Sequence, residues 1–365
     1  MTASFERERA VAEAAVLRAA RLTKKIQSQV SAVSKADATP VTVADFAAQA
    51  LLISALHAAF PGDAFLGEED SSALRSDAQL RDKVYELVVS SAGTTDPDEA
   101  AAALASPSSV EDMLDMIDLG GAGQGGPTGR FWVMDPIDGT ATFLKGQQYA
   151  VALALIENGR EVVGVLAYPS LEVADDGKIY DDTVSGADGL GVLLAAVKGQ
   201  GATIRHFPSQ SAASLSSSPA TPLAAPLEGA ADLRDLRFAD CQRSSSTNHG
   251  LVRRVAERIG ARYPGLDLWA SHVRYAALVL GGADAWVRLG ARDSAVFYIW
   301  DNAGAQLIFT ELGGRITDFD GREIDFGAGR GLDANRGMIA ARANVFDVLF
   351  ATANELLAAE KEGTS

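Results

Sequence analysis

Residues 131–140 read FWVMDPIDGT, and this stretch decides the fold that we expect. Its first four residues are apolar and predict a buried strand that delivers Asp135 at its end. A proline and an isoleucine separate Asp135 from Asp138, so the turn would direct two carboxylates and a free main-chain carbonyl towards one point. Gly139 permits close backbone approach, and a helix that starts after the stretch would add amide donors for a phosphate. By itself, Asp-Pro-x-Asp-Gly is also an ordinary turn sequence.

Further outward, acidic residues stand beside turns in other places. They are Asp37 and Asp45 around a Thr-Pro loop, Glu68 to Asp70, and Asp301 after Trp300. Hard oxygen ligands suit Mg²⁺, and two such ions about 3.5–4 Å apart could activate a water and stabilise the leaving oxygen in displacement at phosphorus. Each acid also has a structural interpretation. Asp45 could complete a capping box with Thr42, residues 68–70 could be a solvated charge run, and Asp301 could be an N-terminal helix acid.

The composition is that of a soluble globular protein with a large core. The chain has 365 residues, of which 47% are hydrophobic and 22% charged, so two lobes or two domains are expected. The formal net charge of −16 argues against binding of polymeric nucleic acid, which depends on clustered Lys and Arg. A nucleotide-sized anion stays compatible with this charge, since divalent cations held by carboxylates reverse the local field.

Cysteine and histidine are scarce. Cys241 is the only cysteine, which excludes an intrachain disulfide and a thiolate-rich zinc site and favours a reducing compartment. There are four histidines and no serine- or histidine-based hydrolase signature, so a nucleophilic triad is disfavoured. The opening residues form no continuous apolar segment, so neither a secretory signal nor a membrane span is expected. We expect a cytoplasmic protein without a membrane partner, with the nucleus as the alternative location.

The predicted elements alternate in the manner of an α+β or α/β fold. Helices are expected over residues 5–30, from Phe46 to Leu56, and over 250–259, 272–280, 301–312 and 345–360. Strands are expected over 149–156, 161–168, from Phe238, and over 285–289. Asn158-Gly159 joins the first two of these strands in a hairpin.

Two segments are interpreted as flexible. Residues 91–129 are rich in Ala, Ser, Asp and Gly and end in a glycine run, so we expect an excursion. A phosphate-cradling loop is the alternative, disfavoured because no strand precedes it and no Lys-Ser/Thr follows. Residues 207–229 are dominated by Ser, Ala and Pro and predict a mobile linker or loop. We expect this linker to divide an N-terminal α+β lobe, residues 1–206, from a C-terminal α/β lobe, residues 230–365, and we expect the C-terminal lobe to complete the metal site and to contact the substrate.

Taken together, these motifs resemble the lithium-sensitive, magnesium-dependent phosphatase superfamily of inositol monophosphatases, inositol polyphosphate 1-phosphatases and 3′(2′),5′-bisphosphate nucleotidases. The string 135–140 and the pair Trp300-Asp301 match its two signatures in the expected order. Residues 6–27, 35–49 and 271–275 resemble the nucleotidase branch, particularly its fungal members. The resemblance implies a layered αβαβα sandwich with two lobes, as in inositol monophosphatase and fructose-1,6-bisphosphatase.

The resemblance also implies a set of metal ligands. Glu68, Asp135 and the carbonyl of Ile137 would bind one Mg²⁺. Asp135, Asp138 and Asp301 would bind a second, so that Asp135 bridges the two ions.

Catalytic and substrate-binding roles follow from the same resemblance. Asp45 would pair with Thr140 to orient and deprotonate the attacking water, with a third, weaker metal ion as a further option. The backbone at Gly139 and Thr140 would hold phosphate oxygens. The nucleotide would be contacted by Ser271, Arg274 and Arg288.

The chain departs from the family pattern at several positions. A Glu-Lys pair often precedes Ile-Trp-Asp in the family, whereas Phe297 and Tyr298 stand here, and the small residues 303–305 are rearranged. Arg274 stands where Lys is often found, and Arg243 where one alignment places His, ahead of a serine run. These departures leave the phosphate pocket and the substrate preference open.

The implied activity is hydrolysis of the 3′-phosphate of adenosine 3′,5′-bisphosphate to give AMP, with action on 3′-phosphoadenosine 5′-phosphosulfate and inhibition by Li⁺. Such an enzyme would clear an inhibitory by-product of sulfate assimilation, as a monomer or weak homo-oligomer. Two alternatives stay open. One is an inositol (poly)phosphate 1-phosphatase, which the carboxylate signatures would serve equally well. The other is a catalytically impaired protein that senses nucleotide or metal, motivated by the altered residues 297–305.

Overall fold

A computed structural model describes residues 4–30, 43–92, 104–186, 189–208, 218–291 and 296–363. The helices are α1 (Glu6–Val30), α2 (Val43–Ala59), α3 (Ser72–Ser76), α4 (Ala78–Ala92), α6 (Val110–Gly121), α7 (Thr140–Phe143), η2 (Leu233–Asp235), α8 (His249–Ile259), α9 (Ser271–Leu280), α10 (Ala305–Glu311) and α11 (Ala343–Gly363). The strands are β1 (Ala64–Gly67), β2 (Arg130–Asp138), β3 (Ala150–Glu157), β4 (Arg160–Tyr168), β5 (Leu190–Val197), β6 (Ala202–Pro208), β7 (Thr221–Pro222), β8 (Ala239–Asp240), β9 (Leu266–Asp267), β10 (Ala285–Arg288), β11 (Gly314–Thr317) and β12 (Met338–Arg342). Among these helices, none combines the length and apolar composition needed to cross a membrane.

Within the described residues, the larger sheet has seven strands in the order β1-β2-β3-β4-β5-β6-β7. β1 and β2 are parallel, and the following neighbours are antiparallel. The predicted hairpin between β3 and β4 is confirmed. Its turn residues Asn158 and Gly159 have φ angles of 51° and 73°, which a two-residue hairpin turn requires. A smaller antiparallel sheet has the order β10-β12-β11.

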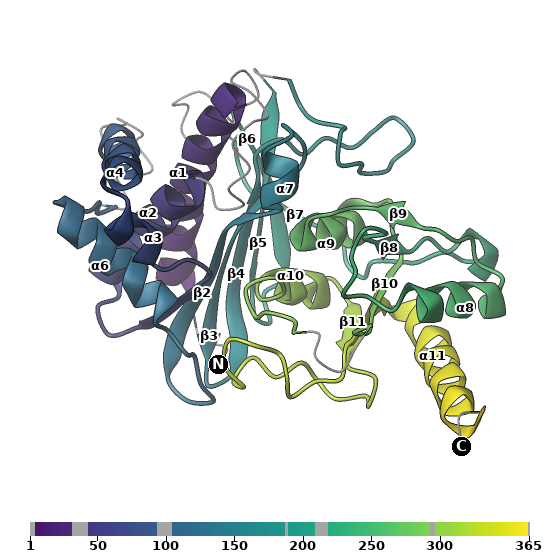
Figure 1. Ribbon diagram of the computed structural model, residues 1–365. Coiled ribbons are helices and arrows are strands. Elements are labelled where there is room, and N and C mark those ends of the chain that lie inside the picture. The colour runs from purple at the N-terminus through teal and green to yellow at the C-terminus, as the bar shows by residue number, and fades with distance from the viewer. Residues whose placement is uncertain are drawn as a thin grey trace.

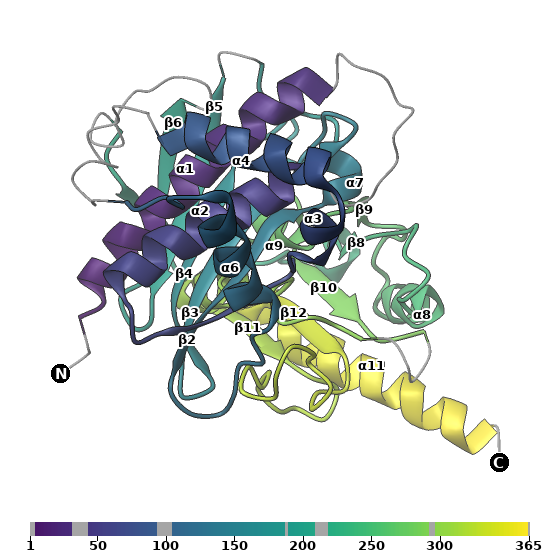
Figure 2. The same ribbon diagram turned by 60° about the vertical axis from the view of Figure 1, so that its left-hand side comes forward.

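The elements stack as an αβαβα sandwich (Figure 1). α1 and α2 cover one face of the large sheet, and α9 and α10 lie between its other face and the small sheet. α8 and α11 pack on the far side of the small sheet. α4 and α6 lie beside α2 in the outer helical layer, as the turned view also shows (Figure 2). The predicted architecture is therefore the observed one.

Strand alternation builds a separate core on each face of the large sheet. On β3, Val151, Leu153 and Leu155 pack against α1 and α2, whereas Ala150 and Ala152 belong to the cluster that includes α9 and α10. Successive side chains of a strand point to opposite faces, so a strand buried on both sides has apolar residues at every position. This explains why β3 has no polar face.

The prediction of a flexible excursion over residues 91–129 is wrong for its second half. α6 begins after Ser109, whose hydroxyl oxygen accepts the N–H of Asp112. The helix buries Met113, Leu114 and Ile117 against the rest of the outer layer. The tertiary contacts of the apolar face of α6 stabilise a helix here, although the many small residues of the segment suggested an irregular structure.

Other boundaries also differ from the prediction. β2 continues past Asp135 to Asp138 through an irregular register. α10 begins at Ala305 instead of Asp301, because Gly304 has a φ of 81° that a helix interior does not allow. In the predicted linker 207–229, β7 pairs with β6, so this part extends the large sheet. The division into two lobes at that linker stays a prediction.

Candidate metal and phosphate site

Acidic side chains from separate segments come together beside the end of β2. β1 runs parallel to β2 in a register that places Glu68 next to Asp135. Asp138 comes from the irregular end of β2, and Asp301 from the turn ahead of α10. One oxygen each from Asp135, Asp138 and Asp301 lie within 4.8 Å of one another. These predicted metal ligands therefore form one cluster.

α2 brings the predicted catalytic base to the same group. The helix is buried on nearly all sides and mostly apolar, and Asp45 is a buried polar exception in its first turn. Its charge contributes to raising the pKa values of Glu68 and Asp135, so the three groups are neighbours. A buried carboxyl beside other carboxyls is costly unless a cation compensates it, which indicates function. Thr42, its partner in the capping-box hypothesis, lies outside the described residues.

Burial and mutual repulsion raise the pKa values of the cluster. Burial is the largest cause for Asp135, followed by the charges of Glu68 and Asp138. Burial of its carboxyl, then Asp301 and Asp45, raise the pKa of Glu68 to about 8, although the residue as a whole keeps an exposed surface. Asp135 is the neighbour of Glu68 that opposes part of this rise in pKa. A divalent cation would offset the repulsion among these carboxylates, and carboxylate oxygens are ligands it prefers, so the residues present fit Mg²⁺.

The turn after Asp135 is held by its own backbone. The N–H of Ile137 donates to Asp135 Oδ1 at 3.1 Å, and the Thr140 hydroxyl donates to the carbonyl of Ile137 at 3.4 Å. Gly139 has a φ of 95°, and a Cβ there would lie 2.8 Å from the Cβ of Ala270. Glycine is therefore required both for the backbone angle and for the close approach of Ala270. The predicted helix after the turn is present as the single turn α7.

Asp138 joins this turn to α9. Its carboxylate oxygens accept the N–H groups of Ser271 at 3.0 Å and His272 at 2.6 Å, at the start of α9. Burial outweighs these bonds, and the pKa of Asp138 is raised. His272 in turn donates from Nε2 to the carbonyl of Trp300, the residue before Asp301, at 2.9 Å. Burial lowers the pKa of His272 to about 4, so a neutral ring makes this contact.

A cavity of about 240 Å³ opens beside the cluster. It is lined by Asp138, Asp240, Cys241, Ser244, Thr247, Trp269, Ser271, Arg274, Trp286, Arg288 and Asp301. The predicted nucleotide-contacting residues thus share one cavity with two predicted metal ligands. The other predicted residues lie outside its described lining: Asp45, Glu68, Asp135, Ile137, Gly139 and Thr140.

Arg274 is a buried residue, contrary to the surface position expected of an ordinary arginine. It donates to the carbonyls of Leu268 at 2.6 Å and Trp269 at 3.1 Å. It also donates to the hydroxyl of Ser271 at 2.9 Å. These bonds fix the guanidinium in the cavity wall.

Arg288 lines the same cavity and has a guanidinium N–H donor that is not used within the described residues. Its guanidinium lies 3.9 Å from the centroid of the Phe297 ring, one of the residues at which the chain departs from the family pattern. Burial lowers its pKa to about 10, and the charge of Asp301 opposes that shift. Among the described residues, its buried Nη1 has no hydrogen-bond partner. A buried cationic donor of this kind is costly unless an anion binds there.

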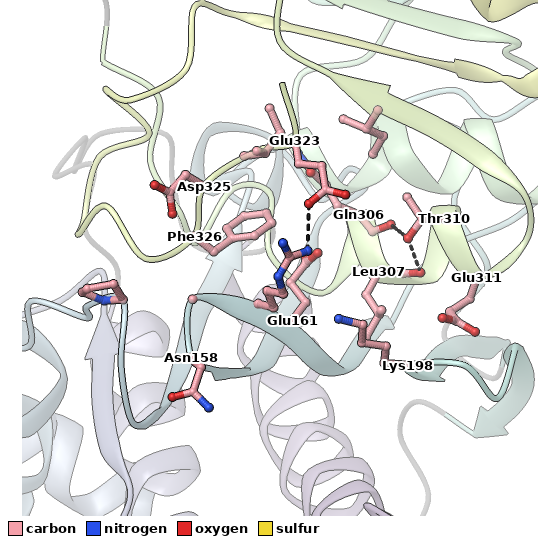
Figure 3. A pocket seen from close by; sticks show the side chains of 15 residues that line it. Asn158, Glu161, Lys198, Gln306, Leu307, Thr310, Glu311, Glu323, Asp325 and Phe326 are labelled. Carbon is pink, nitrogen blue, oxygen red and sulfur yellow. Dashed lines mark hydrogen bonds and ion pairs between the residues drawn. The ribbon is translucent and has the colours of Figure 1, made fainter. Parts of the chain in front are cut away.

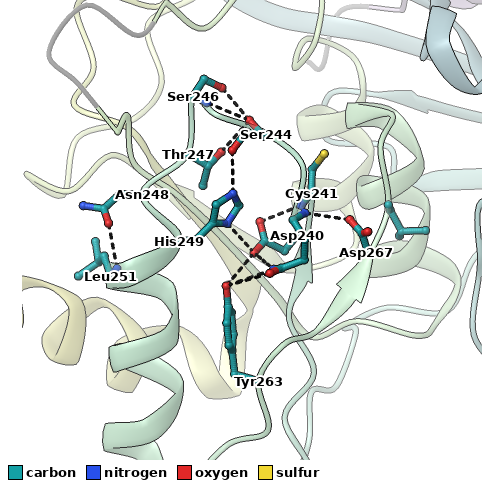
Figure 4. A network of polar contacts seen from close by, with 12 residues as sticks. Asp240, Cys241, Ser244, Ser246, Thr247, Asn248, His249, Leu251, Tyr263 and Asp267 are labelled. Atoms are coloured by element: carbon teal, nitrogen blue, oxygen red, sulfur yellow. Dashed lines mark hydrogen bonds and ion pairs between the residues drawn. The ribbon is translucent and has the colours of Figure 1, made fainter.

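A polar network that sequence analysis missed holds the part of the cavity wall that carries Ser244 (Figure 4). His249 Nε2 donates to the carbonyl of Ser244 at 2.8 Å, and its Nδ1 lies 3.1 Å from a carboxylate oxygen of the buried Asp240. The hydroxyls of Ser244 and Ser246 lie 2.8 Å apart. The signal available in the sequence was Asn248, which caps α8 and so places His249 at the start of that helix.

A larger cavity of about 530 Å³ lies at the β3–β4 turn, α10 and residues 323–326 (Figure 3). There Arg160 and Glu323 form an ion pair of 2.7 Å, and Glu161 accepts the N–H of Gly304 at 2.9 Å. Burial raises the pKa of Glu161 to about 8. None of the predicted site residues is among the described residues that line this cavity, so the smaller one is the candidate site.

The family of the chain follows from comparison with known proteins. A model described as "Inositol monophosphatase family" matches residues 3–349. The chain belongs to this family. It is 38% identical over 360 residues to a 3′(2′),5′-bisphosphate nucleotidase of Emericella nidulans, covering 97% of this chain and 99% of that one. A protein of the same name from Schizosaccharomyces pombe is 36% identical over 358 residues, covering 96% of each chain. The rice protein of that name is 34% identical over 377 residues, 99% of this chain and 97% of its own.

Solved structures of the family share the fold. The TM-score is 0.54 with SaIMPase-II bound to inositol monophosphate, at 16% identity over 98% of this chain and 100% of that one. The TM-score is 0.52 with SaIMPase-II bound to 2′-AMP, at 16% identity over 96% of this chain and 97% of that one. It is 0.53 with SuhB of Mycobacterium tuberculosis, at 20% identity over 96% of each. The predicted family and fold are confirmed.

Proposed function

We propose that this chain is a Mg²⁺-dependent 3′(2′),5′-bisphosphate nucleotidase that removes the 3′-phosphate of adenosine 3′,5′-bisphosphate to give AMP. Relatives of that name match it over nearly their full length. The choice of substrate is supported by the shared cavity, which is lined by Arg274 and Arg288 together with Asp138 and Asp301. A phosphate at the carboxylates and a second anionic group at the arginines would use both halves of this cavity.

The proposed metal ligands are those of the family. Glu68, Asp135 and the carbonyl of Ile137 would hold one Mg²⁺, and Asp135, Asp138 and Asp301 a second, with a third, weaker ion as an option. When bound, such ions supply neutralisation of phosphate charge and a lower pKa for a coordinated water. The convergence of Asp135, Asp138 and Asp301 and the raised pKa values of Glu68 and Asp135 support this proposal.

The residues of the chain would position the reactants and move one proton. Asp45 would accept a proton from the attacking water, and Thr140 would orient that water. The water oxygen would form a bond to phosphorus while the bond between phosphorus and the 3′ oxygen breaks. The 3′ oxygen would take a proton from a solvent water, and the proton held by Asp45 would return to solvent, so the protons balance. The backbone at Gly139 and Thr140 would hold oxygens of the transferred phosphoryl group.

Recognition of the nucleotide is assigned to the second lobe. Ser271, Arg274 and Arg288 would bind the 5′-phosphate, for which the unpaired Nη1 of Arg288 provides a donor. Trp269 also lines the cavity. Lys145 Nζ and Arg243 Cζ lie 3.7 and 4.5 Å from the centroid of its ring, which adds positive charge near the cavity. Action on 3′-phosphoadenosine 5′-phosphosulfate is part of the same proposal.

An inositol phosphatase is the competing function. Because SaIMPase-II is described with inositol monophosphate and with 2′-AMP, the fold does not separate the two substrate classes. The buried arginines favour a substrate with a second anionic group. The lone Cys241 supports a reducing compartment such as the cytoplasm as the place of action.

The proposal is tested by measuring phosphate release in the presence of Mg²⁺ from three substrates: adenosine 3′,5′-bisphosphate, adenosine 3′-monophosphate and inositol 1-phosphate. Turnover of the bisphosphate is expected. Arg288→Met removes a charge-assisted hydrogen bond, so it should raise the KM for the bisphosphate by about 10- to 100-fold. The KM for the 3′-monophosphate should stay nearly unchanged. Hydrolysis of inositol 1-phosphate together with no hydrolysis of the bisphosphate would refute the nucleotidase assignment. Binding of nucleotide with no hydrolysis by wild type or Asp135→Asn would favour a sensing protein.

A further inference from the structure

Arg330, to which sequence analysis gave no role, contacts several parts of the candidate metal site. Its Nη2 donates to the carbonyl of Gly67, the residue before Glu68, at 2.9 Å. Its Nη1 donates to the carbonyls of Gly123 at 3.0 Å and Gly121 at 3.1 Å. The side chain therefore holds two backbone segments of the first lobe at once.

The main chain of Arg330 is attached to the segment that carries Asp301. The N–H of Ile299 donates to the carbonyl of Arg330 at 3.0 Å, and the N–H of Leu332 donates to the carbonyl of Phe297 at 2.7 Å. The guanidinium also lies 4.7 Å from the centroid of the Trp300 ring. One residue thus connects the loop of Glu68 with the turn of Asp301, which lie on different elements.

Tyr298 adds a further layer to this connection. Its ring stacks on that of Trp300, with centroids 4.6 Å apart and an angle of 6° between the planes. The charged pair that the family often has before Ile-Trp-Asp is therefore replaced here by Phe297 under Arg288 and Tyr298 against Trp300. Aromatic contacts hold the segment ahead of Asp301 in place of charges.

The glycine run explains why Arg330 reaches these carbonyls. A Cβ at Gly121 would lie 2.7 Å from the carbonyl oxygen of Glu69, and one at Gly123 would lie 1.8 Å from that of Phe65. The glycine segment consequently packs directly on the backbone that leads from β1 into Glu68. Its carbonyls and that of Gly67 are then close enough for one planar guanidinium, a donor set that a lysine ammonium does not reproduce.

We propose that Arg330 is a positioning residue for the metal centre, which holds the Glu68 loop and the Asp301 turn at the separation that divalent cations require. The proposal rests on the metal-dependent site proposed above but not on the identity of the substrate. Loss of the guanidinium should weaken Mg²⁺ binding while leaving the chemistry at saturating Mg²⁺ largely intact.

Arg330→Lys and Arg330→Met test the proposal in the full chain, with Arg342→Lys as the matched control. Arg342 also donates to main-chain carbonyls, those of Leu278 and Glu228, but contacts no segment that carries a predicted metal ligand. Two titrations are needed for each protein after treatment with EDTA. One follows the melting temperature against Mg²⁺ without substrate, and the other follows phosphate release against Mg²⁺.

Arg330→Lys should raise the half-saturating Mg²⁺ concentration by about tenfold in both titrations, the usual effect of removing a group that orients metal ligands. Its kcat at saturating Mg²⁺ should stay within about threefold of wild type. Arg342→Lys should lower the melting temperature without changing the Mg²⁺ requirement. An unchanged requirement in Arg330→Lys, an equal shift in Arg342→Lys, or a loss of kcat at every Mg²⁺ concentration would overturn the proposal. Since the thermal titration needs no substrate, it stays decisive if the nucleotidase assignment fails, and Arg330→Lys serves if Arg330→Met does not fold.

Discussion

Asp135→Asn should make the metal-free protein more stable while abolishing its response to Mg²⁺. The Asn side chain keeps an oxygen for the N–H of Ile137, which donates to Asp135 at 3.1 Å, and its amide N–H can donate to the neighbouring Glu68 carboxylate. The substitution therefore removes charge with little loss of hydrogen bonding. What it relieves is repulsion among carboxylates that burial prevents water from screening.

The size of the effect follows from the cluster. With oxygens of Asp135, Asp138 and Asp301 within 4.8 Å of one another, each ionised pair repels by about 3.5 kcal/mol at an effective dielectric constant of 20. Protons shared in the metal-free state relieve part of this, which leaves a gain of about 2–3 kcal/mol. At about 2.1 cal/mol/K of unfolding entropy per residue over 365 residues, this gain corresponds to about 3 °C.

Melting curves of wild type and Asp135→Asn at pH 8, in EDTA and in Mg²⁺, check the prediction. Asp284→Asn is the control, because Asp284 is also buried but faces the guanidinium groups of Arg237 and Arg342. Removal of its charge should destabilise the protein and leave the response to Mg²⁺ intact. The reasoning is refuted if Asp135→Asn melts below wild type in EDTA, or if Mg²⁺ stabilises both equally.

In EDTA, the stability of the wild type should fall as pH rises from 4.5 to about 8. The pKa values of Glu68 and Glu69 are raised from 4.5 to about 8 in the folded protein. Between these pH values the unfolded chain releases protons that the folded chain still holds, so a rise in pH favours unfolding. A melting temperature that rises over this range would contradict the prediction. Asp45→Asn should lower kcat by about 10²- to 10⁴-fold with a much smaller change in KM, and an unchanged kcat would remove Asp45 from the role of base. Gly123→Ala should lower the melting temperature, because its Cβ would lie 1.8 Å from a carbonyl oxygen of β1, whereas Gly62→Ala, with open space around it, should not.

The parts of the fold that local sequence determines were predictable. Asn158-Gly159 specifies a two-residue turn because both positions need left-handed φ angles, and the strands on either side follow from it. The carboxylate cluster was also predictable in composition, since buried acids beside turns suit hard cations. The geometry of the cluster was not predictable, because Glu68 reaches Asp135 through the register of β1 and β2, and Asp301 reaches it through the packing of the turn ahead of α10.

The features that were missed depend on contacts between segments far apart in the chain. The glycine run at 120–126 suggested an irregular loop, whereas glycine is needed at 121 and 123 because α6 ends against the backbone of residues 65–70. Nothing near Arg330 in sequence marks it, since its hydrogen-bond partners Gly67 and Gly123 lie more than 200 residues away. The start of α10 was misplaced because an acid before small residues looks like a helix N-terminus, whereas Gly304 bends the chain first.

The contact between Asp138 and the N–H groups of Ser271 and His272 has a consequence for refolding. The carboxylate belongs to β2 of the large sheet and the amides to the start of α9, so the ligand cluster reaches its final arrangement only when α9 has packed against the sheet. After dilution from denaturant, formation of the large sheet should therefore precede the return of phosphatase activity. The return of activity would report the packing of α9, and Mg²⁺ would act late, after that packing.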